Sequence, residues 1–283
     1  MSTFFPFGSR RGPVLAAAVG VLVAFAVLVL AIAGRPGTAP ASAAETKPTI
    51  VLVHGAWADG SSWGDVVTRL QQRGYTVDVP PNPLRGLQSD AAYIRAFLDT
   101  LSGPIVLVGH SYGGAVITNA AKNDAQVKAL AYIDAFAPAE NETVIQLSTE
   151  RPGSALGGNP ADVFDAVPYP GGQGDVDLYI KRTVFPDAVA NDLPPKEAAL
   201  LGATQRPVAL SALLAPSGPP AWEDIESWYF VGTADHAVPP AEQRFMAARA
   251  NAHTVEVKAS HLSMVSRPQQ VTDLILDAAQ SVG

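Results

Sequence analysis

An apolar run that ends in a glycine-flanked serine is the feature of this chain that most constrains its fold. Residues 105–108 are Ile-Val-Leu-Val, and four consecutive apolar residues are typical of a strand buried on both faces. Gly109-x-Ser111-x-Gly113 follows directly, and a helical pattern begins at Ala115. In a sharp strand-to-helix turn of this spacing, the glycines let strand and helix approach each other and the serine hydroxyl is exposed. The sequence therefore predicts a buried strand, a nucleophilic serine at its carboxyl end and a following helix.

The first 44 residues have the pattern of an export signal. Arg10-Arg11 precede an uncharged run from Val14 to Ala33, which is long enough to cross a hydrocarbon core of about 30 Å. The small residues Ala41-x-Ala43 that follow match a signal-peptidase site. We expect residues 1–44 to be a cleaved signal peptide, with a retained membrane anchor as the alternative. In both cases the rest of the chain is expected outside the cytoplasm, secreted or at the cell surface, and residues 14–33 would contact the membrane only if they are not cleaved.

Residues 45–283 are enough for one large α/β domain with a substantial core. The formal net charge is −7 and no basic run occurs beyond the N-terminus, which argues against a nucleic-acid partner. The sequence contains no cysteine, which excludes disulfides, a thiol nucleophile and cysteine-ligated metals. Because it also shows neither a metal-ligand cluster nor a dinucleotide-binding glycine loop, we expect no cofactor and no metal.

Strand patterns alternate with helix patterns along most of the chain. This alternation predicts an α/β fold with a mainly parallel, doubly wound sheet of about six strands. The predicted strands are Thr49–Val53, Tyr75–Val79, Ile105–Val108, Ala129–Ile133, Trp228–Val231 and Thr254–Val257. Two of the predicted helices are Ser89–Leu101, with Ala92, Tyr93, Ala96 and Phe97 on one face, and Arg267–Ala279.

The carboxyl ends of these strands carry the polar residues that could do chemistry. In an open parallel sheet, functional groups collect beyond the carboxyl ends of the strands. The residues that follow the predicted strands there are His54, Ser111, Asp134, Asp235 and His261. The sequence therefore places these five side chains along one edge of the sheet.

A long segment between about residues 138 and 220 interrupts the alternation. It is rich in proline and glycine, with short helical patterns at Asp177–Thr183 and Pro195–Gly202 and no strand pattern. An insertion of this length in a compact domain is usually functional. We expect it to form a helical cap over the turn that carries Ser111.

The chain after residue 47 resembles the α/β-hydrolases, and four stretches bring it close to a small esterase branch of that superfamily. This branch includes plant-type methylesterases, hydroxynitrile lyases and related bacterial esterases. The stretches are Val51–Trp57, Gly109–Gly114, Tyr132–Pro138 and Gly232–His236. The resemblance implies an α/β-hydrolase fold with a catalytic triad in the chain order Ser111, Asp235, His261.

Acyl transfer by a serine requires a base that takes the hydroxyl proton and an acid that orients the base. Ser111 supplies the hydroxyl. His261 is expected to be the base because it follows the last strand and precedes the C-terminal helix. Asp235 and Asp134 are both candidates for the acid. The resemblance favours Asp235, and Asp134 is then expected to stabilise the serine turn or the hinge of the cap.

The resemblance also implies an oxyanion hole, formed by the backbone N–H groups of Ala56 and Tyr112. The substrate pocket is expected to be lined by apolar cap residues and by neighbours of the catalytic groups. The candidates are Trp57, His110, Phe164, Phe185, Leu200 and Leu262.

We therefore expect a serine hydrolase that cleaves carboxylic esters of small or hydrophobic molecules through an acyl-enzyme. A hydroxynitrile lyase is the first alternative, but the lyases that the chain resembles carry a lysine directly after the histidine, and here Leu262 follows His261. A non-catalytic ligand-binding protein with this fold is the second alternative. The complete set of serine, histidine and aspartate argues against it.

Overall fold

The computed structural model describes residues 47–282. The predicted signal peptide or anchor in residues 1–44 lies outside the described residues and stays a prediction. Among residues 47–282, no helix has both the length and the apolar character needed to span a membrane.

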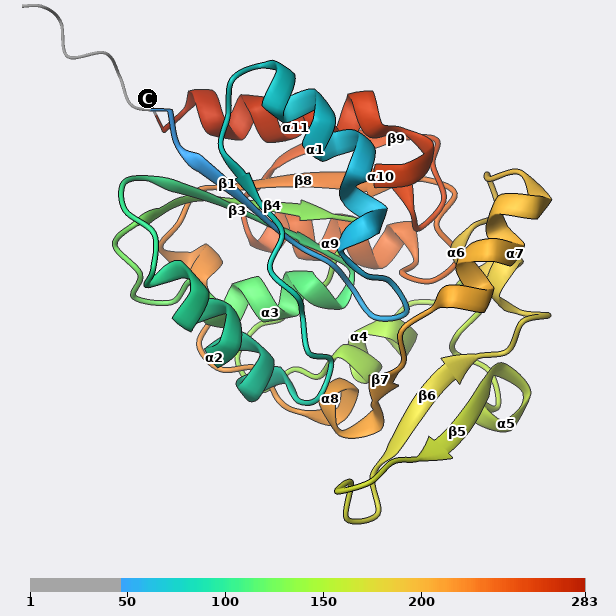
Figure 1. Cartoon of the computed structure of the whole chain (residues 1–283). Helices are drawn as coiled ribbons and strands as arrows, with labels where there is room; N and C mark the ends of the chain where they lie inside the picture. Colours follow the sequence, from blue (N-terminus) through green and yellow to red (C-terminus); the bar gives the residue numbers. More distant parts are fainter. Residues whose placement is uncertain (1–46, 283) are drawn as a thin grey trace, which may run out of the picture. The chain divides into compact units, whose positions relative to one another are not determined.

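A six-stranded sheet lies at the centre of the described residues (Figure 1). All of its neighbouring strands pair in parallel. In spatial order the strands are β2 (Val77–Asp78), β1 (Thr49–Val53), β3 (Ile105–His110), β4 (Val127–Ile133), β8 (Ser227–Gly232) and β9 (His253–Val257). The prediction of a parallel sheet of about six strands is confirmed, although β2 is shorter than the strand predicted at residues 75–79.

The inner strands of this sheet are buried along their length. All six residues of β3 and four of the five residues of β1 are buried, as continuous apolar runs predict for strands covered on both faces. The edge strand β9 is mostly exposed. The apolar run that precedes Ser111 therefore forms the centre of the core.

Helices cover both faces of the sheet, as expected when parallel strands are joined by right-handed crossovers. One face carries α1 (Gly64–Gln72), α10 (Ser263–Ser266) and α11 (Pro268–Gln280), and the other carries α2 (Leu87–Leu98), α3 (Tyr112–Ala120) and α9 (Pro240–Arg249) (Figure 1). The C-terminal helix lies within one residue of its predicted bounds at each end.

The buried face of α2 differs from the prediction. The residues that α2 buries are Leu87, Asp90, Ala91, Ile94 and Leu98. Tyr93, at the centre of the predicted face, is 46% exposed. The helical spacing that starts at Leu87 buries the stripe next to Tyr93 instead.

The strand order reverses direction between β1 and β3. From β1 the chain first crosses to β2 on one side and then returns to place β3 on the other side of β1. In open α/β sheets, ligands bind beyond the carboxyl ends of the strands at such a switch point. The residues that follow β1 and β3, namely 54–57 and Ser111, lie at this point.

The cap, residues 138–220, lies between β4 and β8 and is a mixture of helices and strands. Its strands β5 (Phe164–Pro168), β6 (Val176–Ile180) and β7 (Val208–Ala209) form an antiparallel sheet. Its helices are α4 (Val144–Glu150), α5 (Pro160–Val163), α6 (Phe185–Val189), α7 (Pro195–Thr204) and α8 (Leu210–Leu214). The helix predicted at 195–202 is confirmed by α7, but the expectation of a purely helical cap is wrong.

The helix predicted at residues 177–183 is the strand β6 in the structure. Leu178 and Ile180, two residues apart, are both buried, which is the period of a strand packed on one face. β6 is also tied to the sheet domain, because the carboxylate of Asp177 pairs with the guanidinium of Arg85. A short apolar segment of this kind fits either pattern in sequence, and tertiary packing decides between them.

Candidate active site

Ser111 occupies the sharp turn between β3 and α3. Its φ of +52° and ψ of −125° lie in a region that costs about 1–3 kcal/mol for a residue other than glycine. A Cβ on Gly109 would lie 2.6 Å from the carbonyl oxygen of Gly113, and a Cβ on Gly113 would lie 2.5 Å from the carbonyl oxygen of Val53. Glycine at both positions therefore lets β3, α3 and the end of β1 pack closely enough to hold the strained serine.

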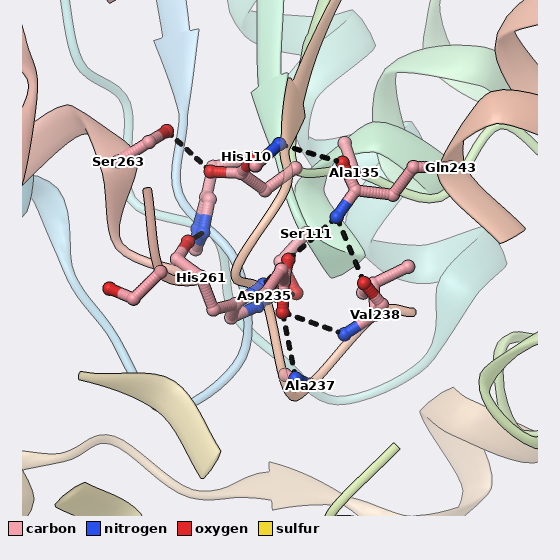
Figure 2. Close-up of polar contacts among 12 residues, drawn as sticks. His110, Ser111, Ala135, Asp235, Ala237, Val238, Gln243, His261 and Ser263 are labelled. Atoms are coloured by element: carbon pink, nitrogen blue, oxygen red, sulfur yellow. Dashed lines mark hydrogen bonds and ion pairs between the residues drawn. The ribbon is translucent and has the colours of Figure 1, made fainter. Parts of the chain in front are cut away.

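His261 lies between Ser111 and Asp235 (Figure 2). The hydroxyl of Ser111 donates a hydrogen bond to Nε2 of His261 at 2.8 Å. Nδ1–H of His261 donates to Oδ2 of Asp235, also at 2.8 Å. All three side chains are buried. Residues from three distant parts of the chain thus form one continuous line of hydrogen bonds, in which His261 can accept the proton of Ser111.

Asp235 is held by four hydrogen-bond donors. Its Oδ1 accepts from the backbone N–H groups of Ala237 at 2.7 Å and Val238 at 2.9 Å. Its Oδ2 accepts from Nε2 of Gln243 at 2.7 Å as well as from His261. Donors of this kind stabilise an ionised carboxylate. Gln243 was not predicted, because no sequence pattern shows that α9 packs back against the end of β8.

Burial keeps two histidines of the site neutral. It lowers the pKa of His261, so at neutral pH its imidazole is neutral and can accept a proton from Ser111. Burial also lowers the pKa of His110 well below its usual value. Nε2–H of His110 donates to the backbone carbonyl of His261 at 2.8 Å. His110 therefore supports the backbone of His261.

The other candidate acid, Asp134, bonds to a different residue. Its Oδ2 accepts a hydrogen bond from the hydroxyl of Ser263, while its Oδ1 has no hydrogen-bond partner within residues 47–282. Burial, and then the negative charge of Asp235, raise the pKa of Asp134 well above its usual range. Burial raises the pKa of Asp235 as well. Because Asp235 has four hydrogen-bond donors and Asp134 has one, we nevertheless assign the negative charge to Asp235 and a proton to Asp134.

The two predicted oxyanion donors both lie beside Ser111. Ala56 follows β1, Tyr112 begins α3, and both line the same cavity as Ser111. Within the described part of the chain, neither backbone N–H has a hydrogen-bond acceptor. The hydroxyl of Tyr112 donates to the buried Asp90 at 2.8 Å, which anchors this residue. Two free donors are therefore available where negative charge could develop on an oxygen.

A cavity of about 200 Å³ connects Ser111 and His261 to the cap. The cap residues that line it include Val144, Ile145, Ser148 and Thr149 of α4, Phe164, Leu178 and Leu213. The described residues around it include no Asp, Glu, Lys or Arg. Likewise, residues 47–282 hold no group of three or more His, Asp or Glu side chains placed to bind a metal ion. The site is thus an uncharged, largely apolar chamber with a hydrogen-bonded serine in its wall.

Two of the six predicted pocket residues, Trp57 and Phe164, line this cavity. Their rings stack with centroids 5.7 Å apart. The contribution of α4 was missed, because its sequence pattern does not show which part of the cap faces Ser111.

The other four pocket predictions are wrong. His110 is buried behind Ser111, where it contacts the backbone of His261. Phe185 and Leu262 line a separate cavity of about 30 Å³. Leu200 lies on α7 and is 62% exposed. The physical reason is that α4, α5, β5, β6 and α8 supply the cap's lining of the Ser111 cavity, whereas α6 and α7 pack on each other.

Comparison with known proteins agrees with the fold. The profile described as "Alpha/beta hydrolase family" matches residues 50–274, and the chain therefore belongs to the alpha/beta hydrolase family.

Several curated relatives are similar over part or most of the chain. The carbendazim hydrolyzing esterase of Nocardioides is 34% identical over 110 residues, which are 34% of this chain and 46% of that protein. An Arabidopsis thaliana protein named as a chloroplastic methylesterase is 26% identical over 261 residues, covering 84% of this chain and 57% of that protein. The pyrethroid hydrolase of Sphingobium wenxiniae is 28% identical over 258 residues, covering 83% and 89%. The chain spans about half the length of the first two relatives.

Solved structures show the same fold at lower sequence identity. The pyrethroid hydrolase of Sphingobium faniae has a TM-score of 0.67 and 24% identity, with 83% of this chain and 98% of that chain covered. Polyneuridine aldehyde esterase has a TM-score of 0.69 and 18% identity, with 82% and 99% covered. These likenesses show the fold.

Proposed function

We propose that this protein is a serine hydrolase that cleaves carboxylic esters of small or hydrophobic molecules through an acyl-enzyme. The observation that carries the proposal is the line of hydrogen bonds from Ser111 through His261 to Asp235. Its Ser111 end lines an apolar cavity, beside two free amides. The relatives named esterases and hydrolases support ester cleavage as the chemistry.

In the first half of the proposed reaction, Oγ of Ser111 attacks the ester carbonyl carbon while Nε2 of His261 takes the hydroxyl proton. Negative charge passes to the carbonyl oxygen, where the amides of Ala56 and Tyr112 can stabilise it. Asp235 holds the imidazole in the tautomer protonated at Nδ1 and stabilises the imidazolium that forms. The tetrahedral intermediate then expels the alcohol, which leaves with the proton from His261.

In the second half, water attacks the acyl-enzyme in the same way. His261 takes a proton from the water, and the oxyanion forms again between the same two amides. The bond between Oγ of Ser111 and the acyl carbon then breaks, the acid is released, and His261 returns the proton to Oγ. The cavity around these atoms is walled by apolar side chains, and a dry site of this kind strengthens the electrostatic interactions with the oxyanion. Neutral esters with apolar groups fit such a chamber better than charged ones, because it offers no counter-ion.

The lyase alternative lacks support in the site. The residue after His261 is Leu262, which is buried beside the separate cavity of about 30 Å³. The described residues that line the Ser111 cavity include no lysine to hold a leaving cyanide.

Substitution of the nucleophile tests the proposed function. Ser111→Ala should reduce the hydrolysis of nitrophenyl esters by about 10⁴–10⁶-fold, because the members of a triad act as one unit. The matched control is Ser227→Ala, since Ser227 is equally buried but lies at the amino end of β8. Turnover by Ser111→Ala near that of the wild type, or an equal loss in Ser227→Ala, would contradict the serine mechanism.

We also propose that the enzyme is exported and released by cleavage after Ala43 or Ala44. Support comes from the arginine pair, the uncharged run of residues 14–33 and the small residues before Glu45. Mass spectrometry of the secreted protein should find Ala44 or Glu45 at its N-terminus. Enzyme found only in the membrane fraction and still carrying residues 14–33 would show a retained anchor instead.

A further inference from the structure

We propose that Trp57 is a specificity-determining residue: its indole closes one end of the Ser111 cavity and thereby limits the length of one of the two groups of the ester. This inference rests on the proposed ester-hydrolase function and adds to it the size of the substrate. It concerns the wall between the Ser111 cavity and a second cavity. The proposed chemistry does not involve this wall.

The first observation is that two cavities meet at Trp57. The cavity of about 200 Å³ holds Ser111, and the cavity of about 30 Å³ lies beyond it. The loop after β1 lines both in succession: Ala56 lines the first, Ala58 lines the second, and Trp57 lines both. The loop after β9 does the same, with His261 on the first and Leu262 on the second. Trp57 is therefore the residue that the two cavities share.

The second observation is that Trp57 is held in place although its backbone conformation is unfavourable. Its φ is +59°, in the left-handed region that is unfavourable for a bulky residue. Nε1–H of the indole donates to the backbone carbonyl of Leu178 in β6 at 2.9 Å. The ring also stacks on Phe164 with an interplanar angle of 19°. Strained residues that the surroundings hold so firmly cluster at ligand-binding sites, and both contacts that hold this one come from the cap.

The third observation is the character of the second cavity. At about 30 Å³ it holds about one water molecule, so no substrate group fits it alone. Phe185, Leu201 and Leu262 form its apolar side, and the polar residues Asp59, Ser61, Ser62 and Thr204 form the rest of its wall. If the indole were removed, this cavity and the space of the indole would extend the Ser111 cavity past Leu262. An unbranched hydrocarbon chain would fit this extension, whereas a longer chain meets the indole in the wild type.

Two variants of Trp57 and two ester series test the proposal. Trp57→Leu opens the wall, and Trp57→Phe retains an aromatic ring but lacks the donor to Leu178. One series lengthens the acyl group of nitrophenyl esters, and the other lengthens the alkyl alcohol of acetates. We expect Trp57→Leu to raise kcat/KM for long relative to short members of one series by about tenfold or more, with a smaller change in Trp57→Phe. Because the ratio is taken within a series, a general loss through the neighbouring Ala56 amide cancels.

Two further variants show whether the effect comes from the wall. Trp222→Leu is the matched control, since the indole of Trp222 also donates to a backbone carbonyl, that of Pro138 at 3.0 Å, but does not line either cavity. It should keep the wild-type length profile. Ala58→Leu fills the second cavity; alone it should leave the profile unchanged, and combined with Trp57→Leu it should restore the wild-type limit. Unchanged ratios in Trp57→Leu, equal changes in both ester series, or failure of Ala58→Leu to reverse the effect would each overturn the proposal.

Binding measurements separate this proposal from the proposed function. Calorimetry of Ser111→Ala protein, with and without Trp57→Leu, uses the matching ketones, in which a methylene replaces the bridging ester oxygen. We expect Trp57→Leu to tighten the binding of long ketones relative to short ones by a factor similar to the kinetic one. If Trp57→Leu shifts ketone binding in this way but the wild type hydrolyses no ester, the role of Trp57 is supported and the hydrolase function is contradicted. Turnover of esters by the wild type, without any shift in length preference in Trp57→Leu, would support the hydrolase function and overturn the role of Trp57.

Discussion

The hydroxyl of Ser263 donates a hydrogen bond to the carboxyl of Asp134, so the turn that carries His261 is anchored two residues past the histidine. The backbone of His261 itself is anchored by Nε2–H of His110. His110 ends β3 and Asp134 follows β4, and these strands are neighbours in the sheet. The position of the imidazole is therefore set from the rigid centre of the sheet, while Asp235 sets its tautomer.

The two buried aspartates should respond differently to the same substitution. Asp235→Asn should lower kcat by about 10⁴-fold, because an amide favours the wrong imidazole tautomer. Asp134→Asn should retain most activity, since an amide oxygen can still accept from Ser263. Steady-state kinetics of the two variants show which aspartate acts as the acid. A larger loss in Asp134→Asn would transfer the role of the catalytic acid to that residue.

Asp134 should also make the stability of the fold depend on pH. Its pKa is raised in the folded protein above the value of 3.8 for an ordinary aspartate, so the folded state keeps a proton that the unfolded chain releases. This retained proton stabilises the folded state relative to the unfolded chain. The contribution to the free energy of unfolding is fully present below about pH 4 and is lost as the pH rises toward the folded pKa of Asp134, by about 1.4 kcal/mol per pH unit. Asp134→Asn removes this titration. Urea unfolding should therefore show the variant gaining stability relative to the wild type as the pH is raised, and a pH-independent difference would mean that Asp134 is ionised in the folded protein.

The serine turn should not tolerate a side chain at Gly109. Its Cβ would lie 2.6 Å from a backbone oxygen of α3, so Gly109→Ala should destabilise the protein by about 1–3 kcal/mol and reduce activity by displacing Ser111. Gly64→Ala is the matched control, because a Cβ there meets nothing within 4 Å at the start of α1, and alanine is favoured in helices. Equal melting temperatures for the two variants would show that the close packing at the turn is not required.

The sheet and the residues at its strand ends were predictable because both follow from local patterns. Apolar runs such as Ile105–Val108 specify buried strands, and a parallel sheet places all of their carboxyl ends along one edge. Ser111, Asp235 and His261 were therefore expected near one another before any contact was known. Their mutual geometry and the partner of Asp134 depend on distances that only the folded structure provides.

The cap was less predictable because its structure depends on packing between short segments. β6 is five residues long and pairs with β5, which ends in a proline, so neither has a strong strand pattern alone. Leu200 is as apolar as Leu213, yet it is exposed on α7 while Leu213 lines the cavity. Which apolar residues face the substrate is decided by the way the cap packs over the sheet, and sequence periodicity does not contain that information.

Asp192 of the cap should act as a positioning residue for His261. Its Oδ1 accepts a hydrogen bond from the hydroxyl of Ser260, the buried residue directly before His261, and its Oδ2 lies 3.5 Å from the guanidinium of Arg267. Asp192→Ala should lower kcat by about two- to tenfold, the equivalent of one hydrogen bond, with little change in KM. Asp192→Asn should recover most of this loss, because its amide oxygen can still accept from Ser260.

The control for this prediction is Asp165→Ala, which removes a cap aspartate whose ion pair with Lys181, at 3.0 Å, lies within the cap. It should leave kcat unchanged, because neither partner touches the turns that carry Asp235 and His261. Melting temperatures measured beside the kinetics separate positioning from folding: a purely structural Asp192 would lower the melting temperature and the amount of active enzyme, but leave kcat per active site unchanged. A fall in kcat per active site that Asn rescues and that Asp165→Ala does not share is the result expected if the cap holds His261 in line with Ser111.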